Sequence, residues 1–582
     1  MKDKWLITNL PLDDQREYIL VVNKPPVYFY TRKSTYLDKP GYGRGLIIKV
    51  DGYVMPRAAV FDQYRDLEQR NLVFQLYQKY GKDFIHYVKG IFTIVIIDGS
   101  NFYIFNDPSG VRKFFHYANG EHFVFTNRLE CITNRHPLSI REEHAALFSL
   151  MEHFIDGMTL FNEVTYSTPA TCVCFSDSLK IDHYWNYLDL TGKEVRNYSF
   201  TEFAGYFRDL IAGYTAYFAP KDVTMTLTGG NDSRTILSAL LNISMKPRAF
   251  TFGNPDSYDG VVAREITEKT GMEYSNYFVD NPSAEWFERM GKEIIPLGHS
   301  LVNIHRAHRL DAIQKEKEQF PDTDMLFAGF MGGDYIKGIV YDDYITAKLV
   351  RLWEYTEENK RSLVKRLLKE KFFRVEKLDL DYILNRLEAQ PFFNLPTKIE
   401  REFAYVFNVV GAVHDAQDTN VFNAYVRYVV NIFMDIDFLE FLFGSPYSMM
   451  NRDNSSKNQL KRLLQPALQC NMINLLAPEL SDIEFAKHYS PKEFLGNKLI
   501  YAFKRMYRYY YYRKFAASFP YGEWFPPYVA QAMEDMHPFI EDLLNLQRTK
   551  RHLGNNQHQE KEGYWHRYTN IINIDRIIKC YG

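Results

Sequence analysis

The stretch that decides the fold reads Val223-Thr-Met-Thr-Leu-Thr-Gly-Gly-Asn-Asp-Ser-Arg-Thr-Ile-Leu237. An apolar strand leads into a loop at residues 228–233, and a helix follows. The two glycines of this loop allow backbone N–H groups to approach an anion closely. The N-terminus of the helix adds unpaired N–H groups and a partial positive charge, and Thr228 and Ser233 add hydroxyl donors. We therefore predict that this loop binds phosphate.

An aspartate is an unusual residue in an anion-binding loop. Asp232 would repel a phosphate group unless a cation such as Mg²⁺ bridged the two. The alternative interpretation is a tight strand–helix turn that is capped by an Asp or Ser side chain. The loop is not of the Walker A type, because the pattern G-x-x-x-x-G-K-S/T does not occur in the chain.

Strands and helices alternate along the chain after this loop. The alternation predicts a parallel, doubly wound sheet in an α/β domain. From about residue 346 onward the pattern is almost entirely helical. The expected strands are residues 223–227, 248–252 and 324–328, and the expected helices are residues 203–217, 233–241 and 261–270.

The first 190 residues show a different sequence pattern, in which short β-branched and aromatic runs are bounded by Gly, Asn, Asp and Pro. They predict an α+β domain with sheets as its core. A polar stretch, residues 187–201, is the expected linker, which places one domain at residues 1–195 and a second at 205–582. The expected strands are residues 45–50, 90–98, 102–105, 123–126 and 170–175, and the expected helices are 71–80 and 142–153.

The composition excludes several classes of protein. The 582 residues carry 70 Lys and Arg against 72 Asp and Glu, so neither nucleic acid nor an anionic membrane is an expected partner. Five cysteines are too few for a disulfide framework. We see no signal peptide and no run long enough to span a bilayer, and we therefore expect a cytoplasmic protein. Aromatic residues make up 16% of the chain, and we expect most of them in the core.

The loop at 228–233 resembles the S-G-G-x-D-S pyrophosphate loop of the PP-loop ATP pyrophosphatases, with Thr228 in place of the serine. Two further segments resemble the synthase domain of the asparagine synthetase family. They are Phe250-Thr-Phe-Gly253 and the glycine-rich segment at residues 329–338, which contains Asp334.

The resemblance implies ATP and Mg²⁺ as cofactors. The aspartates Asp232 and Asp334 would be the metal ligands, and they would lie at the carboxyl ends of two parallel strands. The residues implied to contact the nucleotide are Thr228, Gly229, Gly230, Asp232, Ser233, Phe252, Gly253 and Gly333.

The N-terminal part is similar to the class II glutaminase domain of the same family, over residues 71–81, 88–98 and 105–117. The resemblance implies a glutaminase-like β-sheet sandwich of the Ntn type. These glutaminases use a cysteine directly after the initiator methionine, whereas this chain has Lys2, and the aspartate for the substrate's amino group is replaced by Gln69. An ammonium group cannot replace a thiolate nucleophile, so we predict that the glutaminase activity is lost.

The expected function is an ATP-dependent ligase that forms an amide bond through an acyl-adenylate. Its partners would be a small-molecule or peptide carboxylate and either ammonia or an amine, and a homodimer or a partner from the same biosynthetic gene cluster would be compatible with it. β-Lactam synthetases and lasso-peptide macrolactam cyclases of this family also lack the cysteine, and the segment at residues 332–338 resembles that of the cyclases. The alternatives are a macrolactam cyclase and a catalytically weak homologue that acts as a binding partner.

Met331 stands where asparagine synthetases carry glutamate and β-lactam synthetases carry tyrosine. A thioether transfers no proton, so another residue must accept the proton of the attacking amine. The candidates for this base are His299, His414, Asp415 and Asp418.

The family also places a lysine on the phosphates in the transition state. Here the resemblance implies Lys487, with Lys492 as the alternative. A lysine in this role stabilises the negative charge that develops on the leaving pyrophosphate.

Overall fold

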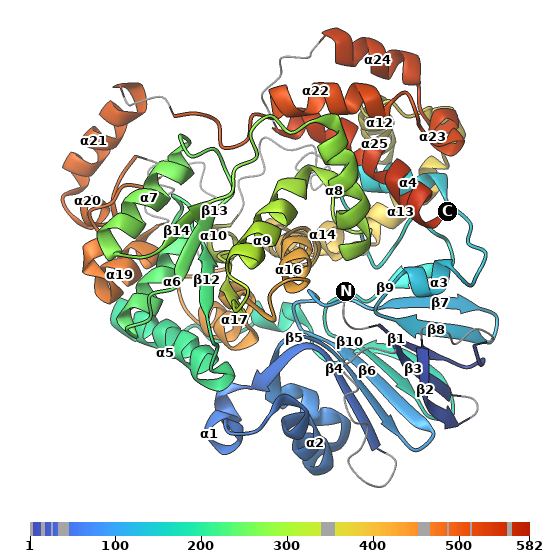
Figure 1. The fold of residues 1–582 in the computed structure, drawn as a ribbon, viewed down its shortest axis with the longest axis horizontal. Helices are drawn as coiled ribbons and strands as arrows, with labels where there is room; N and C mark the ends of the chain where they lie inside the picture. Colours follow the sequence, from blue (N-terminus) through green and yellow to red (C-terminus); the bar gives the residue numbers. More distant parts are fainter. Residues whose placement is uncertain are drawn as a thin grey trace.

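The computed structural model describes residues 4–12, 18–24, 27–32, 46–298, 300–338, 356–451, 466–485, 488–511, 515–555 and 562–582. Two antiparallel sheets form the N-terminal part, in blue and cyan in the lower half of Figure 1. A parallel sheet with many helices follows them. The predicted α/β class and the expected Ntn-like antiparallel sheets are confirmed.

The first antiparallel sheet has the strand order β2-β3-β1-β8-β7-β9. The second has the order β11-β10-β6-β5-β4, and β4 and β5 pair along eleven residues. The strands are β1 (Trp5–Thr8), β2 (Tyr18–Lys24), β3 (Val27–Arg32), β4 (Leu46–Pro56), β5 (Val88–Asp98), β6 (Asn101–Asn106), β7 (Phe115–Asn119), β8 (His122–Thr126), β9 (Val164–Tyr166), β10 (Thr171–Phe175) and β11 (Leu179–His183).

The side chains of β5 point alternately to its two faces, and this alternation explains why the N-terminal part forms layers. Val95 and Ile97 face the first sheet and share a core with Trp5. Ile94 and Ile96 point to the opposite face, where helix α2 (Gln69–Tyr80) covers the second sheet. All five strands expected here are present, and β4 extends six residues beyond its predicted end because it continues to pair with β5.

The parallel sheet has the strand order β14-β13-β12-β15-β16. Its strands are β12 (Val223–Thr226), β13 (Arg248–Thr251), β14 (Tyr274–Asn276), β15 (Met325–Phe327) and β16 (Tyr428–Val430). The first, second and fourth of these were expected from the sequence. The expectation of an almost purely helical chain after residue 346 misses β16, because three residues are too few to show a periodicity.

Helices surround the parallel sheet and extend from it. Those between the strands are α5 (Phe200–Phe218), α6 (Asn231–Asn242), α7 (Tyr258–Thr270), α8 (Ala284–Leu297), α9 (Ala307–Gln319), α10 (Gly332–Lys337), α12 (Glu357–Glu370), α13 (Leu380–Glu388), α14 (Pro391–Asn394), α15 (Lys398–Tyr405), the π-helix η8 (Val406–Asp415) and α16 (Ala416–Asn423). After β16 follow α17 (Ile436–Phe443), α19 (Ala467–Leu476), α20 (Pro491–Leu495), α21 (Lys498–Tyr511), α22 (Tyr521–Ala532), α23 (Pro538–Leu543), α24 (Leu546–Asn555) and α25 (Glu562–Tyr581).

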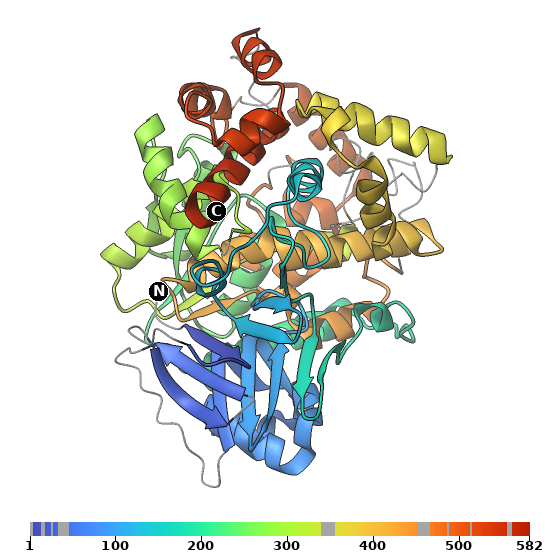
Figure 2. The same cartoon turned by 90° about the vertical axis from the view of Figure 1, so that its right-hand side faces the viewer.

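The short helices of the N-terminal part are α1 (Phe61–Tyr64), α3 (Glu130–Thr133), α4 (Glu142–Met151), η2 (Gly81–Tyr87) and η3 (Tyr187–Leu190). The C-terminal helix α25 returns to pack against α4. His566 of α25 forms a 2.8 Å contact with Glu152, directly after α4. In Figure 2 the red C-terminal helices lie at the top and the blue strands at the bottom. None of the described helices is long and apolar enough to cross a membrane.

A buried group of charges joins the antiparallel sheets to the rest of the molecule. The ammonium group of Lys89, in β5, lies 3.1 Å from Asp435 and 3.0 Å from Asp437, and all three side chains are at most 6% exposed. Arg57 extends the group, because it contacts Asp437 at 2.7 Å and Glu440 at 2.7 Å. Buried charges require such partners, so this network holds β5 against the segment that follows β16.

We expect Lys89→Met to lower the free energy of unfolding by about 3–5 kcal/mol, because two carboxylates would remain buried without their ammonium partner. Urea unfolding followed by circular dichroism measures this loss. Adding Asp435→Asn should recover part of it. The control Lys398→Met acts at a lysine that is 56% exposed and pairs with Glu402, and it should change the free energy by less than about 0.5 kcal/mol. Equal effects of the two single variants would contradict the role given to Lys89.

Candidate functional site

The loop at residues 228–233 follows the carboxyl end of β12, and a second glycine-rich loop follows β15. The strand order reverses between these two strands, because β13 and β14 extend the sheet on one side and β16 extends it on the other. Open α/β sheets bind their ligands in the crevice at such a reversal. The sheet thus places both loops where a ligand site is expected.

A cavity of about 270 Å³ lies at these loops. Besides the first loop, its lining includes the end of β13, Gly329 after β15 and two residues of a distant segment, Ser518 and Phe519. Six residues that the sequence predicts to contact a nucleotide line it, namely Thr228, Gly230, Asp232, Ser233, Phe252 and Gly253.

The first loop is held by hydrogen bonds of its own residues and of α7. The Thr228 N–H donates to the Ser233 hydroxyl at 3.3 Å, and the Gly229 N–H donates to the Asp259 carboxylate at 2.9 Å. Burial raises the pKa of Asp259. Below the loop, Arg234 donates to the carbonyls of Ile483 at 2.6 Å and Glu484 at 2.8 Å, which ties α6 to the segment after α19.

The second loop packs directly on the first, and only glycine permits this distance. A Cβ atom on Gly329 would lie 2.9 Å from the backbone nitrogen of Ser233. A Cβ atom on Gly332 would lie 2.9 Å from the Asp232 carboxyl carbon and 2.7 Å from the Phe433 ring. Gly333 also faces the Asp232 carboxylate, at 3.4 Å from its Cβ position. The two predicted motifs therefore meet in space.

The approach of the two loops brings acidic groups together. The pKa of Asp334 is raised to about 7 by burial and by the negative charges of Asp415 and Asp232, which the ammonium group of Lys337 opposes only in part. A cation would relieve this repulsion.

The carboxylates at the two loops would suit Mg²⁺ if water and substrate completed its coordination. Within the described ranges there is no cluster of three or more His, Cys, Asp or Glu side chains that could hold a metal. Mg²⁺ bound to proteins commonly uses one or two carboxylates and completes its octahedron with water and substrate phosphates. Asp232 and Asp334 would supply such a pair, and the ion would neutralise charge on a bound triphosphate.

The other end of the cavity is aromatic. The rings of Phe252 and Phe519 stand nearly parallel, with 6.3 Å between centroids. The guanidinium carbon of Arg309 lies 5.7 Å from the Phe252 ring, and the carbonyl of Ser518 accepts a 2.9 Å hydrogen bond from Asn254, next to Gly253. The sequence analysis missed Arg309, Ser518 and Phe519, because no local motif marks residues that reach the site from distant segments.

Met331 is buried at the start of α10, where its φ of 67° lies in the left-handed region. Its terminal methyl lies 3.4 Å from the Cβ position of Gly411 in η8. Of the candidate bases, Asp415 is close enough to raise the pKa of Asp334. Asp418 instead pairs with Arg306 and Arg309, His414 contacts Arg306, and His299 lies outside the described residues.

Lys487 also lies outside the described residues. The alternative, Lys492, is largely exposed and pairs with Asp482 at 2.9 Å. A lysine that the sequence analysis did not select is nearer to the loops. The Lys337 ammonium nitrogen lies 3.7 Å from the Cβ position of Gly333 and stabilises the ionised form of Asp334.

In the N-terminal part, Gln69 has a structural use. Its side-chain oxygen accepts a 2.8 Å hydrogen bond from the Val54 N–H and thereby links α2 to β4. Nearby in the same strand, the buried Asp51 accepts hydrogen bonds from Arg112 at 3.1 Å and Asn127 at 2.6 Å. Although burial favours the neutral acid, these partners hold the pKa of Asp51 below its usual value.

The contact between the two loops can be tested with one methyl group. Gly332→Ala should lower the midpoint of thermal unfolding, because the new Cβ atom would overlap Asp232 and the Phe433 ring and cost about 1–3 kcal/mol. The matched control is Gly205→Ala in α5, where the Cβ atom meets nothing within 4 Å. That change should be neutral or stabilising by up to about 1 kcal/mol. An unchanged midpoint for Gly332→Ala would contradict the close packing of the loops.

Two of the solved structures that match this chain have low sequence identity to it. Glutamine phosphoribosylpyrophosphate amidotransferase from B. subtilis, complexed with ADP and GMP, is 14% identical over 46% of this chain and 56% of its own, with a TM-score of 0.19. A structure described as the allosteric regulatory enzyme of purine biosynthesis is 11% identical over 56% of this chain and 68% of its own, with a TM-score of 0.20. This chain thus spans little more than half of the B. subtilis enzyme.

The comparison with curated proteins found no match to this chain. Residues 61–185 match the family model of the glutamine amidotransferase domain. The matched segment runs from α1 past the end of β11 and includes most of the second antiparallel sheet. The N-terminal part of the chain therefore carries a glutamine amidotransferase-like domain of class II.

Proposed function

We propose that this protein is an ATP-dependent ligase that activates a carboxylate as an acyl-adenylate and converts it to an amide. The observation that carries the proposal is the meeting of two glycine-rich loops, with Asp232 and Asp334, at the point where the strand order of the parallel sheet reverses. The cavity combines the start of α6, the Asp232 carboxylate and an aromatic wall. Asp334 lies close enough to Asp232 to feel its charge. This arrangement would suit a magnesium nucleotide.

In the first step, an oxygen of the substrate carboxylate attacks the α-phosphorus of ATP. The bond from this phosphorus to the bridging oxygen breaks, and pyrophosphate leaves towards the loop at residues 228–233. Mg²⁺ would neutralise charge on the phosphates. The loop hydroxyls of Thr228 and Ser233 and the ammonium group of Lys337 would stabilise the leaving pyrophosphate.

In the second step, an amine nitrogen attacks the acyl carbon, AMP leaves with the electrons of the C–O bond, and the nitrogen loses a proton. Asp415 is the candidate acceptor for this proton, because it lies near Asp334, whereas Met331 cannot accept one. Holding the amine and the adenylate in one site would contribute much of the rate.

We further propose that the glutamine amidotransferase-like domain hydrolyses no glutamine. The support is Gln69, which stands where the resemblance places the aspartate for the substrate's amino group and which instead accepts a hydrogen bond from β4. The amine would then be ammonia from solution or a group on the substrate itself, as in a macrolactam cyclase.

The assay is the release of pyrophosphate from ATP in the presence of candidate carboxylates. We expect Asp232→Asn and Asp334→Asn each to lower this rate by at least about 100-fold, because each removes a charge that holds the metal. Removal of Mg²⁺ with EDTA should abolish it. Asp62→Asn, at a side chain that is 97% exposed, should leave the rate unchanged. A binding protein without catalysis would give no substrate-dependent pyrophosphate under any of these conditions.

The variant Lys337→Met tests whether Lys337, rather than Lys492, acts on the leaving pyrophosphate. The loss of a charge beside Asp334 should lower the rate of pyrophosphate release about 10- to 100-fold with a smaller change in KM, because the charge acts on the leaving group. Lys492→Met, at an exposed lysine paired with Asp482, is the matched control and should have no effect. Equal rates in both variants would rule out Lys337.

A further inference from the structure

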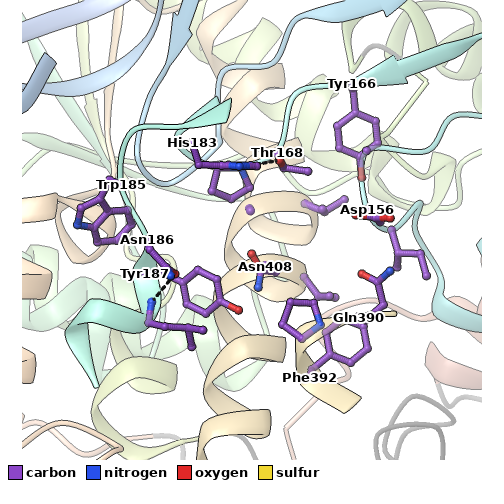
Figure 3. A pocket seen from close by; sticks show the side chains of 18 of the residues that line it. Asp156, Tyr166, Thr168, His183, Trp185, Asn186, Tyr187, Gln390, Phe392 and Asn408 are labelled. Carbon is purple, nitrogen blue, oxygen red and sulfur yellow. Dashed lines mark hydrogen bonds between the residues drawn. The ribbon is translucent and has the colours of Figure 1, made fainter. Parts of the chain in front are cut away.

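A second cavity is larger than the one at the glycine-rich loops. It measures about 670 Å³ and lies between the glutamine amidotransferase-like domain and the helices α14 and η8. Figure 3 shows side chains of both parts facing one space, with Tyr166, His183 and Tyr187 from the first and Gln390 and Asn408 from the second. Its volume is within the range of sites for small organic ligands.

The cavity has an apolar floor and a polar rim. Phe392, Val409 and Ala412 are at most 4% exposed and form part of the floor. His183 and Asn186 are exposed at the rim. Six of the lining residues are aromatic: Phe154, Tyr166, Tyr184, Trp185, Tyr187 and Phe392. Such walls accept a flat, apolar group.

The charges of this lining do not favour a phosphate. Lys113 is the one lysine or arginine that the described lining contains. Its ammonium group already donates to the Gly110 carbonyl at 2.6 Å and lies 5.0 Å from the Tyr166 ring. Asp156 pairs with Arg386 at 3.1 Å. A ligand with little net charge therefore fits better than a nucleotide.

Two carboxamide groups provide directed hydrogen bonds. Gln390 donates its NH₂ group to the Arg386 carbonyl at 3.0 Å, and Asn408 donates to the Ala404 carbonyl at 3.1 Å. These bonds fix both side chains, and each carboxamide oxygen keeps its capacity as an acceptor. Burial raises the pKa of Tyr187 to about 12 although Asn408 opposes the shift, so its phenol stays protonated and polar. Acceptors beside aromatic walls match the N–H groups of a peptide that carries an aromatic side chain.

The π-helix η8 connects this cavity to the glycine-rich loops. Asn408, Val409, Ala412 and Val413 line the cavity. On the same helix, Gly411 packs on Met331, and Asp415 acts on Asp334. π-Helical segments occur frequently at functional sites. A molecule bound in the cavity would therefore rest on the same element that carries the candidate base.

We propose that the cavity between the amidotransferase-like domain and η8 binds a peptide segment of the substrate through an aromatic side chain. This inference rests on the proposed ligase function and names its substrate class as a peptide. The aromatic ring would enter between the floor and the tyrosine and tryptophan side chains, and backbone N–H groups would donate to Gln390 and Asn408.

The test is photo-crosslinking of the full chain with a defined probe, the capped tripeptide N-acetyl-Gly-(p-benzoylphenylalanine)-Gly amide. Mass spectrometry should place the crosslinks at residues 154–157, 183–189 or 390–413. N-acetyl-Gly-Phe-Gly amide should compete, and N-acetyl-Gly-Gly-Gly amide should compete at least about tenfold less well, because it lacks the ring. Crosslinks elsewhere, or equal competition by both peptides, would overturn the inference.

Two variants probe the cavity itself. Ala412→Phe fills it and should reduce crosslinking at least about tenfold. Asn408→Leu keeps the side-chain volume but removes an acceptor and should reduce crosslinking roughly three- to tenfold. The matched control is Asn471→Leu in α19, because Asn471 makes the same type of bond, to the Ala467 carbonyl at 2.8 Å, and lines neither cavity. Undiminished crosslinking in both cavity variants would also overturn the inference.

The crosslinking needs no ATP, so the two proposals can fail separately. Specific crosslinking without any pyrophosphate release would support the peptide site and refute the proposed ligase function. The opposite result is pyrophosphate release with a small carboxylate but no specific crosslinking. It would support the ligase function and refute the peptide site. Asp232→Asn should crosslink like the unaltered protein, because Asp232 does not line this cavity.

Discussion

The position of Lys89 between two buried aspartates is the interaction on which the arrangement of this molecule depends. An ammonium group without water is stable only beside negative charge, so β5 must face the segment after β16. Asp435 also accepts hydrogen bonds from two N–H groups at the start of α17 and from the Tyr214 hydroxyl of α5 at 2.7 Å. This buried charge thus helps to fix how the second antiparallel sheet, α5 and α17 lie relative to one another.

The two cavities follow from this arrangement. The larger one lies between the amidotransferase-like domain and η8, so its walls come together only when the two parts of the chain are held against each other. The smaller one collects residues from five separate segments of the chain, and Arg309 and Phe519 are among these residues. The antiparallel domain thereby contributes a wall to a cavity without taking part in the chemistry proposed for the glycine-rich loops.

The abundance of aromatic residues has a mainly structural explanation. Rings pack on rings at the contacts between elements, as between Tyr206 of α5 and Phe441 of α17, whose centroids are 3.9 Å apart. Helix α21 differs, because Phe503 and Tyr507 are 64% and 56% exposed on it. Rings also face open space in the linings of the two cavities.

The sequence by itself determined the features that depend on neighbouring residues. The glycine-rich turn between β12 and α6, the loop around Asp334 and the alternating strands of the N-terminal sheets all follow from local propensity and spacing. Tertiary structure alone decided that Gly332 lies against Asp232, that Asp415 and Lys337 approach Asp334, and that β16 completes the sheet. These contacts join residues more than 80 positions apart, or they depend on the course of a whole loop. Neither a periodicity nor a local motif in the sequence indicates which distant side chains will lie beside a buried charge.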